Sequence, residues 1–280
     1  MAWRISGFGD EIADDLATQL RVMKSLGVDA LEPRKIGLPG GSAKNIVDLT
    51  DAELRTVQAM LADNGLKCSQ IGSPVGKAPL DVDFKDQKRQ LVSAIRAAQA
   101  LGTNYVRVFA FQLGAEPATQ ARRARALDLF VRLADVATKT DSDIRLMLEN
   151  EHDLFDATPD ECMQFITSSS AGNVGMCFDP GNFIHAGVRP FGQAWPLLES
   201  HVGMMHIKDY RPRDDSWVPA GVGDGELPDV LRAADPTKVA FLSVEPHLAN
   251  APWGRGRPKD ELWGEAVRAL RALLPTTSSG

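Results

Sequence analysis

Four side chains that can hold a metal ion recur at strand-like positions in the second half of the sequence. Each lies at the end of a short apolar run or inside it, and the four are Glu149, Asp179, His206 and Glu245. They are separated by 30, 27 and 39 residues. Three carboxylates and one imidazole form a hard, mostly oxygen ligand set, which suits Mn²⁺, Mg²⁺ or Co²⁺ better than a metal that prefers sulfur. The pattern predicts one divalent metal site if the fold brings the four side chains together.

Each residue of this set also has an ordinary structural explanation. Glu149 is explained equally well as a charge at a strand end, and Asp179, which precedes Pro-Gly, as a turn former. A histidine between apolar residues, such as His206, is more often a hydrogen-bonded core residue than a ligand. Glu245 is harder to explain in this way, because a buried carboxylate without a partner costs free energy. The structural explanation needs four coincidences at four consecutive strand ends, so a shared metal site is favoured.

Eight short apolar runs typical of buried β-strands recur along the chain, and their first residues are 27 to 39 residues apart. A β-α-β unit takes about 30 residues or more, so this spacing fits one strand and one helix per step. The expected strands are Trp3–Phe8, Ala30–Pro33, Lys67–Ile71, Tyr105–Phe109, Ile144–Leu148, Val174–Phe178, Gly203–Ile207 and Val239–Val244. Helical apolar periodicity is found between them, over Asp15–Leu26, Gln87–Leu101, Thr119–Thr138, Pro159–Ser168 and Glu261–Leu274.

A further helix is expected from Thr50 to Gly65, because Thr50 and Glu53 have the spacing of a capping box. Eight such steps predict an α/β fold, a single-domain (βα)8 TIM barrel over residues 1–275 with a flexible tail over residues 276–280. The runner-up is a doubly wound open sheet, but the GxGxxG of a dinucleotide-binding turn does not follow the first strand. In a barrel the carboxyl ends of all strands meet at one mouth, which would bring the four candidate ligands together.

Two long loops rich in glycine and proline, Lys35–Val47 and Asp209–Glu226, each follow a candidate strand. In a barrel both would lie at the catalytic face, where long loops often act as lids. The stretch Gly221–Glu226 resembles a phosphate-binding loop in its glycines, but it lacks the GK[ST] ending. It is therefore interpreted as a turn before the next helix.

Composition restricts the classes of partner. The 280 residues carry a formal net charge of -6, which argues against a protein that binds by neutralising nucleic-acid phosphates. No apolar stretch approaches the roughly 20 residues that span a membrane, and the acidic N-terminal region does not resemble a secretory signal. The three cysteines Cys68, Cys162 and Cys177 form no CxxC pair, so a disulfide framework is not indicated. A cytoplasmic protein is expected.

Several other polar residues lie near the predicted mouth, and each keeps two interpretations. Lys208 is either a group that holds a substrate oxygen or a solvated loop charge. Arg107 lies in an apolar run, where it would pair with a barrel carboxylate or contact substrate. His152 would line the pocket or support the metal ligands. Glu11 and Glu32 would bind sugar hydroxyls or pair with Arg107.

At these positions the sequence resembles the sugar phosphate isomerase/epimerase superfamily of xylose-isomerase-like TIM barrels. The motifs that carry the resemblance are Leu148-Glu149-Asn150, Asp179-Pro180-Gly181-Asn182, His206-Ile207-Lys208-Asp209 and Val244-Glu245-Pro246. The resemblance implies that Glu149, Asp179, His206 and Glu245 bind one divalent ion, with Mn²⁺ expected first and Mg²⁺ or Co²⁺ as alternatives. It further implies that Glu149 and Glu245 are catalytic acid/base groups on opposite sides of the substrate, and that the chain forms a homodimer or homotetramer.

One residue departs from the pattern of some superfamily members. Ketose 3-epimerases usually carry a histidine three residues after the Asp of the sixth strand, where this chain has Asn182. The difference argues against a simple ketohexose epimerase. Endonuclease IV needs more histidine ligands than a chain with five histidines and an acidic balance offers. The candidate substrate-binding residues are His152, Asn182, Lys208, Arg107 and Glu11.

Three functions are consistent with these residues and with the resemblance. The first is a metal-dependent isomerase or epimerase of a sugar or sugar derivative, acting through an enediolate formed by proton abstraction next to a carbonyl. The second is a metal-dependent lyase or dehydratase that eliminates a β-substituent from a keto-sugar, keto-inositol or 3-keto-glycoside. The third is a sugar-binding barrel without catalysis, because a fold by itself does not fix a function.

Overall fold

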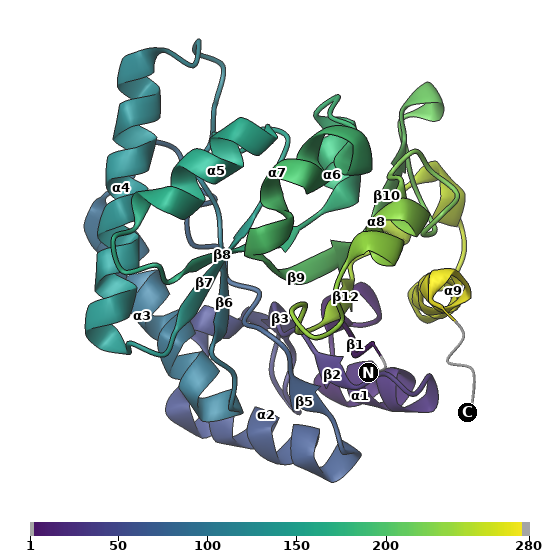
Figure 1. Cartoon of the computed structure of the whole chain (residues 1–280). Coiled ribbons are helices and arrows are strands. Elements are labelled where there is room, and N and C mark those ends of the chain that lie inside the picture. Colours follow the sequence, from purple (N-terminus) through teal and green to yellow (C-terminus); the bar gives the residue numbers. More distant parts are fainter. Residues whose placement is uncertain (1–2, 276–280) are drawn as a thin grey trace.

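Eight short parallel strands form the centre of the computed structural model, which describes residues 3–275. Figure 1 shows them curled together with helices on the outside. Each of the eight predicted runs overlaps one of these strands, although β7 ends one residue after its run and β9 begins one residue before its run. They are β1 (Ile5–Gly7), β2 (Ala30–Leu31), β5 (Lys67–Cys68), β6 (Tyr105–Val108), β7 (Arg145–Glu149), β8 (Val174–Phe178), β9 (Val202–Ile207) and β12 (Leu242–Val244).

Backbone pairing closes these strands into a ring. Six of them form one sheet in the order β1-β12-β9-β8-β7-β6, and β2 pairs with β5 in parallel. The single bridge between Phe8 and Glu32 joins β1 to β2, and the bridge between Ile71 and Val106 joins the β5 side to β6. The predicted TIM barrel is therefore confirmed. The expected strand Ala30–Pro33 is too long, because regular pairing ends at Leu31 before the proline, which has no backbone N–H.

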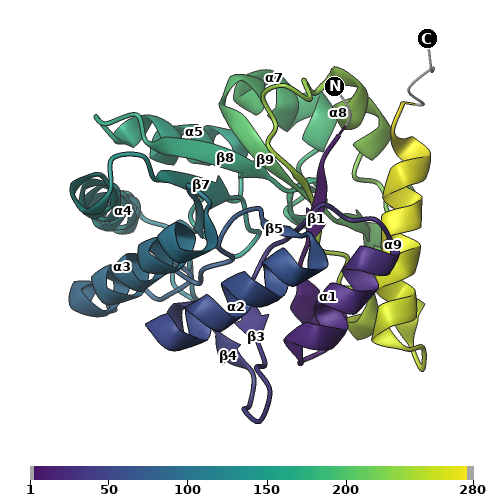
Figure 2. The ribbon, with the colours of Figure 1, turned by 90° about the horizontal axis from the view of Figure 1, so that it is seen from below.

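The helices cover the outside of the barrel, as Figure 2 shows from below. They are α1 (Leu16–Ser25), α2 (Asp51–Asn64), α3 (Phe84–Leu101), α4 (Gln120–Thr140), α5 (Pro159–Ser168), α6 (Pro180–His185), α7 (Trp195–Leu198), α8 (Leu227–Ala233) and α9 (Lys259–Leu273). The predicted capping box of α2 is confirmed: the Thr50 backbone N–H donates to Glu53 Oε2 at 2.8 Å, and the Glu53 N–H donates to Thr50 Oγ1 at 3.3 Å. None of the described helices is long and apolar enough to cross a membrane.

Both predicted lid loops contain an antiparallel hairpin. Strands β3 (Lys35–Ile36) and β4 (Lys44–Asn45) pair in the first loop, and β10 (Asp209–Arg211) and β11 (Ser216–Val218) pair in the second. In the second loop the Asp209 carboxylate accepts hydrogen bonds from the backbone N–H groups of Gly221, Gly223 and Gly225 at 2.8 to 3.0 Å. The glycine-rich stretch is thus a turn tied to Asp209 before α8, as the sequence predicted.

Inward-facing residues at the lower end of the strands fill the barrel interior. Met147, Cys177 and Met204 are buried in one cluster with Ala30, Ala240 and Phe241. Glu149, Asp179 and His206 each lie two residues further along the same strand or directly after it. Because side chains alternate between the two faces of a strand, residues two apart share a face. The apolar cluster therefore fills the lower part of the barrel interior, and the polar residues lie above it at the mouth.

The capping box of α2 is expected to make a pH-dependent contribution to the stability of the chain. The Lys44 ammonium and the Thr50 groups lower the pKa of Glu53 to about 2. A carboxyl with a lower pKa in the folded chain adds stability above its ordinary pKa near 4.5, and this stability is lost as the pH falls through about 2. The difference in melting temperature between the wild type and Glu53→Gln should be largest at pH 7 and should shrink as the pH falls below 4.5. A difference that does not depend on pH would contradict this assignment.

Candidate metal centre

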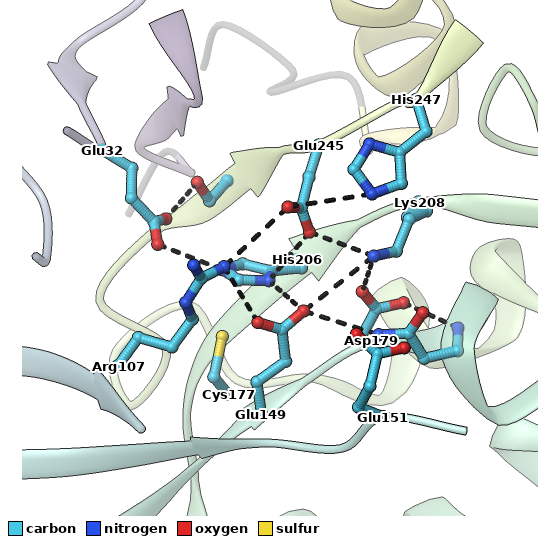
Figure 3. Close-up of polar contacts among 12 residues, drawn as sticks. Glu32, Arg107, Glu149, Glu151, Cys177, Asp179, His206, Lys208, Glu245 and His247 are labelled. Atoms are coloured by element: carbon cyan, nitrogen blue, oxygen red, sulfur yellow. Dashed lines mark hydrogen bonds and ion pairs between the residues drawn. The ribbon is translucent and has the colours of Figure 1, made fainter. Parts of the chain in front are cut away.

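The fold brings the four predicted ligand residues together at the carboxyl ends of β7, β8, β9 and β12. Glu149, Asp179, His206 and Glu245 each offer one ligand atom, and these atoms all lie within 4.8 Å of one another. All four residues are at most 2% exposed. Figure 3 shows their side chains converging on one region with Lys208. An oxygen-rich group of this kind could hold a divalent ion.

Neighbouring amides aim Asp179 at this centre. The Asn150 side chain donates from Nδ2 to the Asp179 carbonyl and accepts the Asp179 N–H at its Oδ1, each at 2.9 Å. Asp179 is also the N-cap of α6, where its Oδ1 accepts the Asn182 N–H at 2.9 Å. The second oxygen, Oδ2, faces the centre, where Lys208 Nζ lies 2.9 Å from it. Burial raises the pKa of Asp179 to about 7, although the nearby Lys208 ammonium opposes the shift.

A buried carboxylate behind His206 sets the direction of its ring. His206 Nε2 lies 3.2 Å from Glu32 Oε1, and a hydrogen on this nitrogen would donate to the carboxylate. Glu32 is held by Gln70 Nε2 at 2.8 Å and by Ser243 Oγ at 2.5 Å. The other ring nitrogen, Nδ1, lies 2.9 Å from Glu149 Oε1 but is buried and has no hydrogen-bond partner among residues 3–275. A carboxylate behind a histidine and a free nitrogen in front are typical of a metal ligand.

Each of the two glutamates directs one carboxylate oxygen toward the centre and the other toward an arginine. Glu149 accepts a hydrogen bond from Arg107 Nη1 at Oε2 (3.0 Å), and its Oε1 faces His206. Glu245 accepts from Arg34 Nη1 at Oε1 (2.6 Å), and its Oε2 faces Lys208 at 3.0 Å. Each glutamate thus keeps one oxygen at the centre and one against a guanidinium.

The surrounding cations keep both glutamates ionised. Burial alone would raise the pKa of Glu149, but the His206 and Arg107 charges lower it below the ordinary value. Burial would likewise raise the pKa of Glu245, and Lys208 and His247 hold it well below the ordinary value. For His206 the order is reversed: burial lowers its pKa, whereas Cys177 and the nearby carboxylates raise it well above the usual range.

Lys208 reaches into the centre. Its Nζ lies 2.9 Å from Asp179 Oδ2, 3.0 Å from Glu245 Oε2 and 3.9 Å from Glu149 Oε1. The residue is 3% exposed, so the interpretation as a solvated loop charge is wrong. Burial would lower the pKa of Lys208, but the three carboxylates raise it well above the usual value. The ammonium therefore balances the charge of three of the four candidate ligands.

The remaining predicted residues lie around this centre. Arg107 is buried and pairs with Glu149, which is the carboxylate pairing expected for it. Asn182 is also buried, and its Nδ2 donates to the Asn150 carbonyl at 2.9 Å. His152 lies at the rim, where its Nδ1 is 2.8 Å from Glu151 Oε1. It forms no hydrogen bond or ion pair with the four candidate ligands, and it is not one of the residues that line the cavity over the centre.

Glu11 and Glu32 were each expected to bind sugar hydroxyls or to pair with Arg107. The expected pairing with Arg107 is wrong, because neither glutamate forms an ion pair with it. Glu11 Oε1 lies 2.7 Å from His247 Nδ1 and 3.6 Å from Arg34 Nη2. Glu32 is fully buried beneath His206. The bridge from Phe8 to Glu32 carries the Glu32 side chain into the barrel, whereas Glu11 lies further along the chain at the rim.

Sequence reasoning missed three residues of the site, namely Arg34, Gln70 and Glu151. Arg34 and Gln70 follow strands β2 and β5, so the strand-end rule that was applied to the last four strands would have found them. Glu151 comes two residues after Glu149 and pairs with Lys77 Nζ at 2.6 Å. Burial raises the pKa of Glu151, but His152, Lys208 and Lys77 together lower it far below the ordinary value.

A cavity of about 310 Å³ opens over the centre. It is lined by Arg34, Lys35, Asn45, Gly72, Pro74, Lys77, Arg107, Phe109, Glu149, Glu151, Lys208, Glu245 and His247. A larger hollow of about 690 Å³ lies at the opposite end of the barrel, among residues such as Lys67 and Arg145 that begin the strands. It contains none of the predicted site residues, and active sites of such barrels lie at the other face, so the smaller cavity is the candidate substrate pocket.

Comparison with known proteins gives the family and the fold. A family model described as xylose isomerase-like TIM barrel matches residues 20–273. No curated protein matches the sequence. Among solved structures, the probable 3-DHS dehydratase AsbF involved in petrobactin synthesis from Bacillus anthracis is 16% identical, with a TM-score of 0.74 over 97% of this chain and 99% of that chain.

Two further solved structures are similar over nearly the whole chain. An L-ribulose 3-epimerase is 18% identical with a TM-score of 0.73, and the match covers 98% of this chain and 95% of that chain. A xylose isomerase-like TIM barrel protein from Mycobacterium smegmatis in complex with magnesium is 19% identical with a TM-score of 0.68, and 98% of each chain is covered. At these identities the likeness shows a shared fold.

Substitution of the buried Glu32 behind His206 tests whether the centre binds a metal ion. Glu32→Gln keeps the size of the side chain but removes the charge that orients the ring, so Mn²⁺ affinity should fall about 10- to 100-fold. Isothermal titration of the folded chain with Mn²⁺ measures the change. Glu265→Gln, which alters a partly exposed carboxylate paired with Arg257, is the matched control and should bind Mn²⁺ as the wild type does. Unchanged affinity in Glu32→Gln would contradict the assignment.

Asp179→Asn tests the candidate ligand itself. It replaces the Oδ2 that faces the centre by an uncharged group, so Mn²⁺ affinity should fall by more than in Glu32→Gln. The N-cap function of the side chain is retained by asparagine, so the melting temperature of the metal-free chain should change little. If Asp179→Asn binds Mn²⁺ with wild-type affinity, Asp179 is not a ligand.

Proposed function

The chain belongs to the xylose isomerase-like TIM barrel family, and we propose that it is a divalent-metal-dependent isomerase or epimerase of a sugar or sugar derivative. The observation that carries the proposal is the placement of two ionised glutamates around one centre. His206 Nδ1 lies between them, 2.9 Å from Glu149 Oε1 and 3.4 Å from Glu245 Oε2. Such a pair can remove a proton on one side of a substrate and return one on the other.

The residues present fit a divalent ion. Three carboxylate oxygens and one unpartnered imidazole nitrogen face the same point, and Glu149, Asp179, His206 and Glu245 would hold the ion there. A bound divalent ion would act as a Lewis acid that stabilises negative charge on the carbonyl and hydroxyl oxygens of a sugar. We expect Mn²⁺ to fill this role, with Mg²⁺ or Co²⁺ as alternatives.

The protein groups supply proton transfer and orientation. Glu149 and Glu245 are ionised at neutral pH, so either can accept a proton from a carbon next to a carbonyl. Arg107 and Arg34 hold their second oxygens and thereby fix the direction of each carboxylate. The Lys208 ammonium has three N–H donors, and two of them can be used by Asp179 and Glu245. The third can donate a hydrogen bond to a substrate oxygen.

The destination of the proton decides the product. If the second glutamate returns it to the same carbon from the opposite face, the product is an epimer. If the proton is delivered to the neighbouring carbon, an aldose and a ketose interconvert. A pocket of about 310 Å³ lies at the lower end of the usual range of ligand pockets and suits a substrate of monosaccharide size.

A second candidate, a lyase or dehydratase, is favoured by His152 and Glu151. The hydrogen bond to Glu151 raises the pKa of His152 despite partial burial. A histidine with a raised pKa can protonate a leaving group, and Lys208 is a further donor near the glutamates. Elimination of a β-substituent from a keto-sugar or 3-keto-glycoside would then start with the same proton abstraction.

Replacement of either glutamate tests the shared first step. Glu149→Gln and Glu245→Gln keep an oxygen for the centre but remove the base, so deuterium exchange from D₂O into substrate should fall at least about 100-fold. Exchange is followed by NMR at saturating Mn²⁺, and Mn²⁺ occupancy is measured in every sample. Glu265→Gln is the control. Wild-type exchange in both variants with the ion bound would refute the proposal.

Product analysis separates the two candidates. With the wild type, recovery of an isomer or epimer supports the first, whereas release of water or of an aglycone supports the second. His152→Gln should leave deuterium exchange within about threefold of wild type if the reaction is epimerisation, because no leaving group needs a proton. Under the lyase mechanism His152→Gln should instead slow the elimination, measured as the rate at which water or the aglycone is formed.

A further inference from the structure

Three cations and two aromatic rings alternate along one wall of the pocket. Lys77 Nζ lies 4.9 Å from the Phe109 ring centroid, and Arg107 Cζ lies 4.8 Å from the same centroid. Arg107 Cζ is also 5.0 Å from the Phe8 ring, and Arg34 Cζ is 4.3 Å from it. We call these five residues the cation–aromatic row. Cation–π attraction helps to hold the charged groups in place. Arg34 already donates to Asp10 and Glu245, and Lys77 donates to Glu151 at 2.6 Å, so Arg34 Nη2 and the other two N–H donors of the Lys77 ammonium are the groups that a ligand can use.

Two glycines allow the loop after β5 to approach this row. A Cβ at Gly72 would lie 2.8 Å from Phe8 Cε1, closer than side chains pack. Gly76 has a φ of +84°, and a Cβ there would overlap the Phe109 carbonyl oxygen. The loop that carries Lys77 is therefore packed against the row, which places Lys77 at the solvent-exposed edge of the pocket.

Cations outnumber carboxylates among the groups that line the pocket. The lining cations are Arg34, Lys35, Lys77, Arg107 and Lys208, and the lining carboxylates are Glu149, Glu151 and Glu245. Three carboxylates outside the lining also pair with these cations, Asp10 and Glu11 with Arg34 and Asp179 with Lys208, whereas Lys35 forms no ion pair within residues 3–275. A divalent ion at the centre would add positive charge to the same space. Neutral sugars have no group that uses this surplus.

The cations differ in depth. Arg107 and Lys208 are buried at the floor beside Glu149 and Glu245. Lys35 is exposed at the rim, and it forms no ion pair within residues 3–275. The Lys77 side chain is 41% exposed and that of Arg34 is 23% exposed, so both can reach a ligand at the mouth. A substrate with its reacting carbons at the floor would place its far end among these three groups.

We propose that the substrate carries an anionic group, a carboxylate or a phosphate monoester, and that Lys35, Lys77 and the outer edge of Arg34 bind it. This inference rests on the proposed function, since it concerns the substrate of that same site. Charge-assisted hydrogen bonds from lysine and arginine to such anions are among the stronger polar contacts in proteins. The anionic end would also fix which carbons face Glu149 and Glu245.

Matched ligand pairs test the proposal on the full chain saturated with Mn²⁺. D-ribulose and D-ribulose 5-phosphate form the phosphate pair, and D-glucose and D-glucuronate form the carboxylate pair. Calorimetry gives Kd for each ligand, and NMR in D₂O gives proton exchange. In at least one pair the anionic member should bind about 10-fold more tightly or better, and this preference should weaken as salt is raised from about 20 to 200 mM. The pair that shows the preference identifies the anion.

Removal of the rim charges decides whether they are the cause. Lys35→Met and Lys77→Met should each reduce the preference, and the double variant should abolish it. Lys88→Met, which removes the same charge from an exposed position of α3 outside the pocket, is the matched control and should keep the preference. A preference that survives in the double variant would overturn the proposal, because the anion would then be bound elsewhere, for example at the ion itself.

The outcomes distinguish this inference from the proposed function. If neutral and anionic members bind and exchange alike in the wild type, the inference fails and the proposed function stands. If no ligand exchanges protons but the anionic members bind more tightly through Lys35 and Lys77, the charge selection stands and the proposed reaction fails. Failure of both readouts with Mn²⁺ bound overturns both.

Discussion

The structure around the mouth is governed by the cost of burying three carboxylates close together. Glu149, Asp179 and Glu245 are almost inaccessible to water, and isolated charges in such a place are strongly unfavourable. Arg107, Arg34 and Lys208 supply compensating charge, and the Asn150 amide supports Asp179 from behind. A group of like charges is maintained only where each has such a partner. The two arginines bind one oxygen of each glutamate, and the second oxygen of each faces a common point together with Asp179 Oδ2 and the Lys208 ammonium. Convergent carboxylate oxygens of this kind are what a divalent ion requires.

The barrel explains why residues that are far apart in sequence meet in this way. Parallel strands end at the same edge, and closure of the ring brings β12 beside both β1 and β9. The two-residue period of a strand then decides which side chains point inward. Met147 and Cys177 fill the lower barrel interior by this rule, and Glu149 and Asp179 lie above them at the mouth. The same geometry gives the pocket a floor with acidic and basic groups and a rim with Lys35 and Lys77.

Much of the candidate site was predictable because it follows from strand ends. The spacing of apolar runs indicates eight strands, and the residue after each run in the second half of the chain is ionisable. Sequence reasoning was less successful where a side chain has a partner from a distant element. Glu32 was assigned to a sugar or to Arg107, but it lies behind His206, because closure between β1 and β2 turns it into the barrel. The position of Arg34 after β2 would have placed it at the mouth, but nothing local links it to Glu245, which is 211 residues away.

The sequence by itself determined the alternation of strands and helices, the caps of α2, and the types and order of the four candidate ligands. These properties are local, since apolar periodicity and capping depend on residues a few positions apart. Only the tertiary structure decided which carboxylate meets which cation, that Lys208 is buried at the centre, and that Lys77 and Arg34 belong to one row of cations and rings. Those contacts depend on how the ring of strands closes and on how loops pack over it, and short-range sequence patterns contain no information about either.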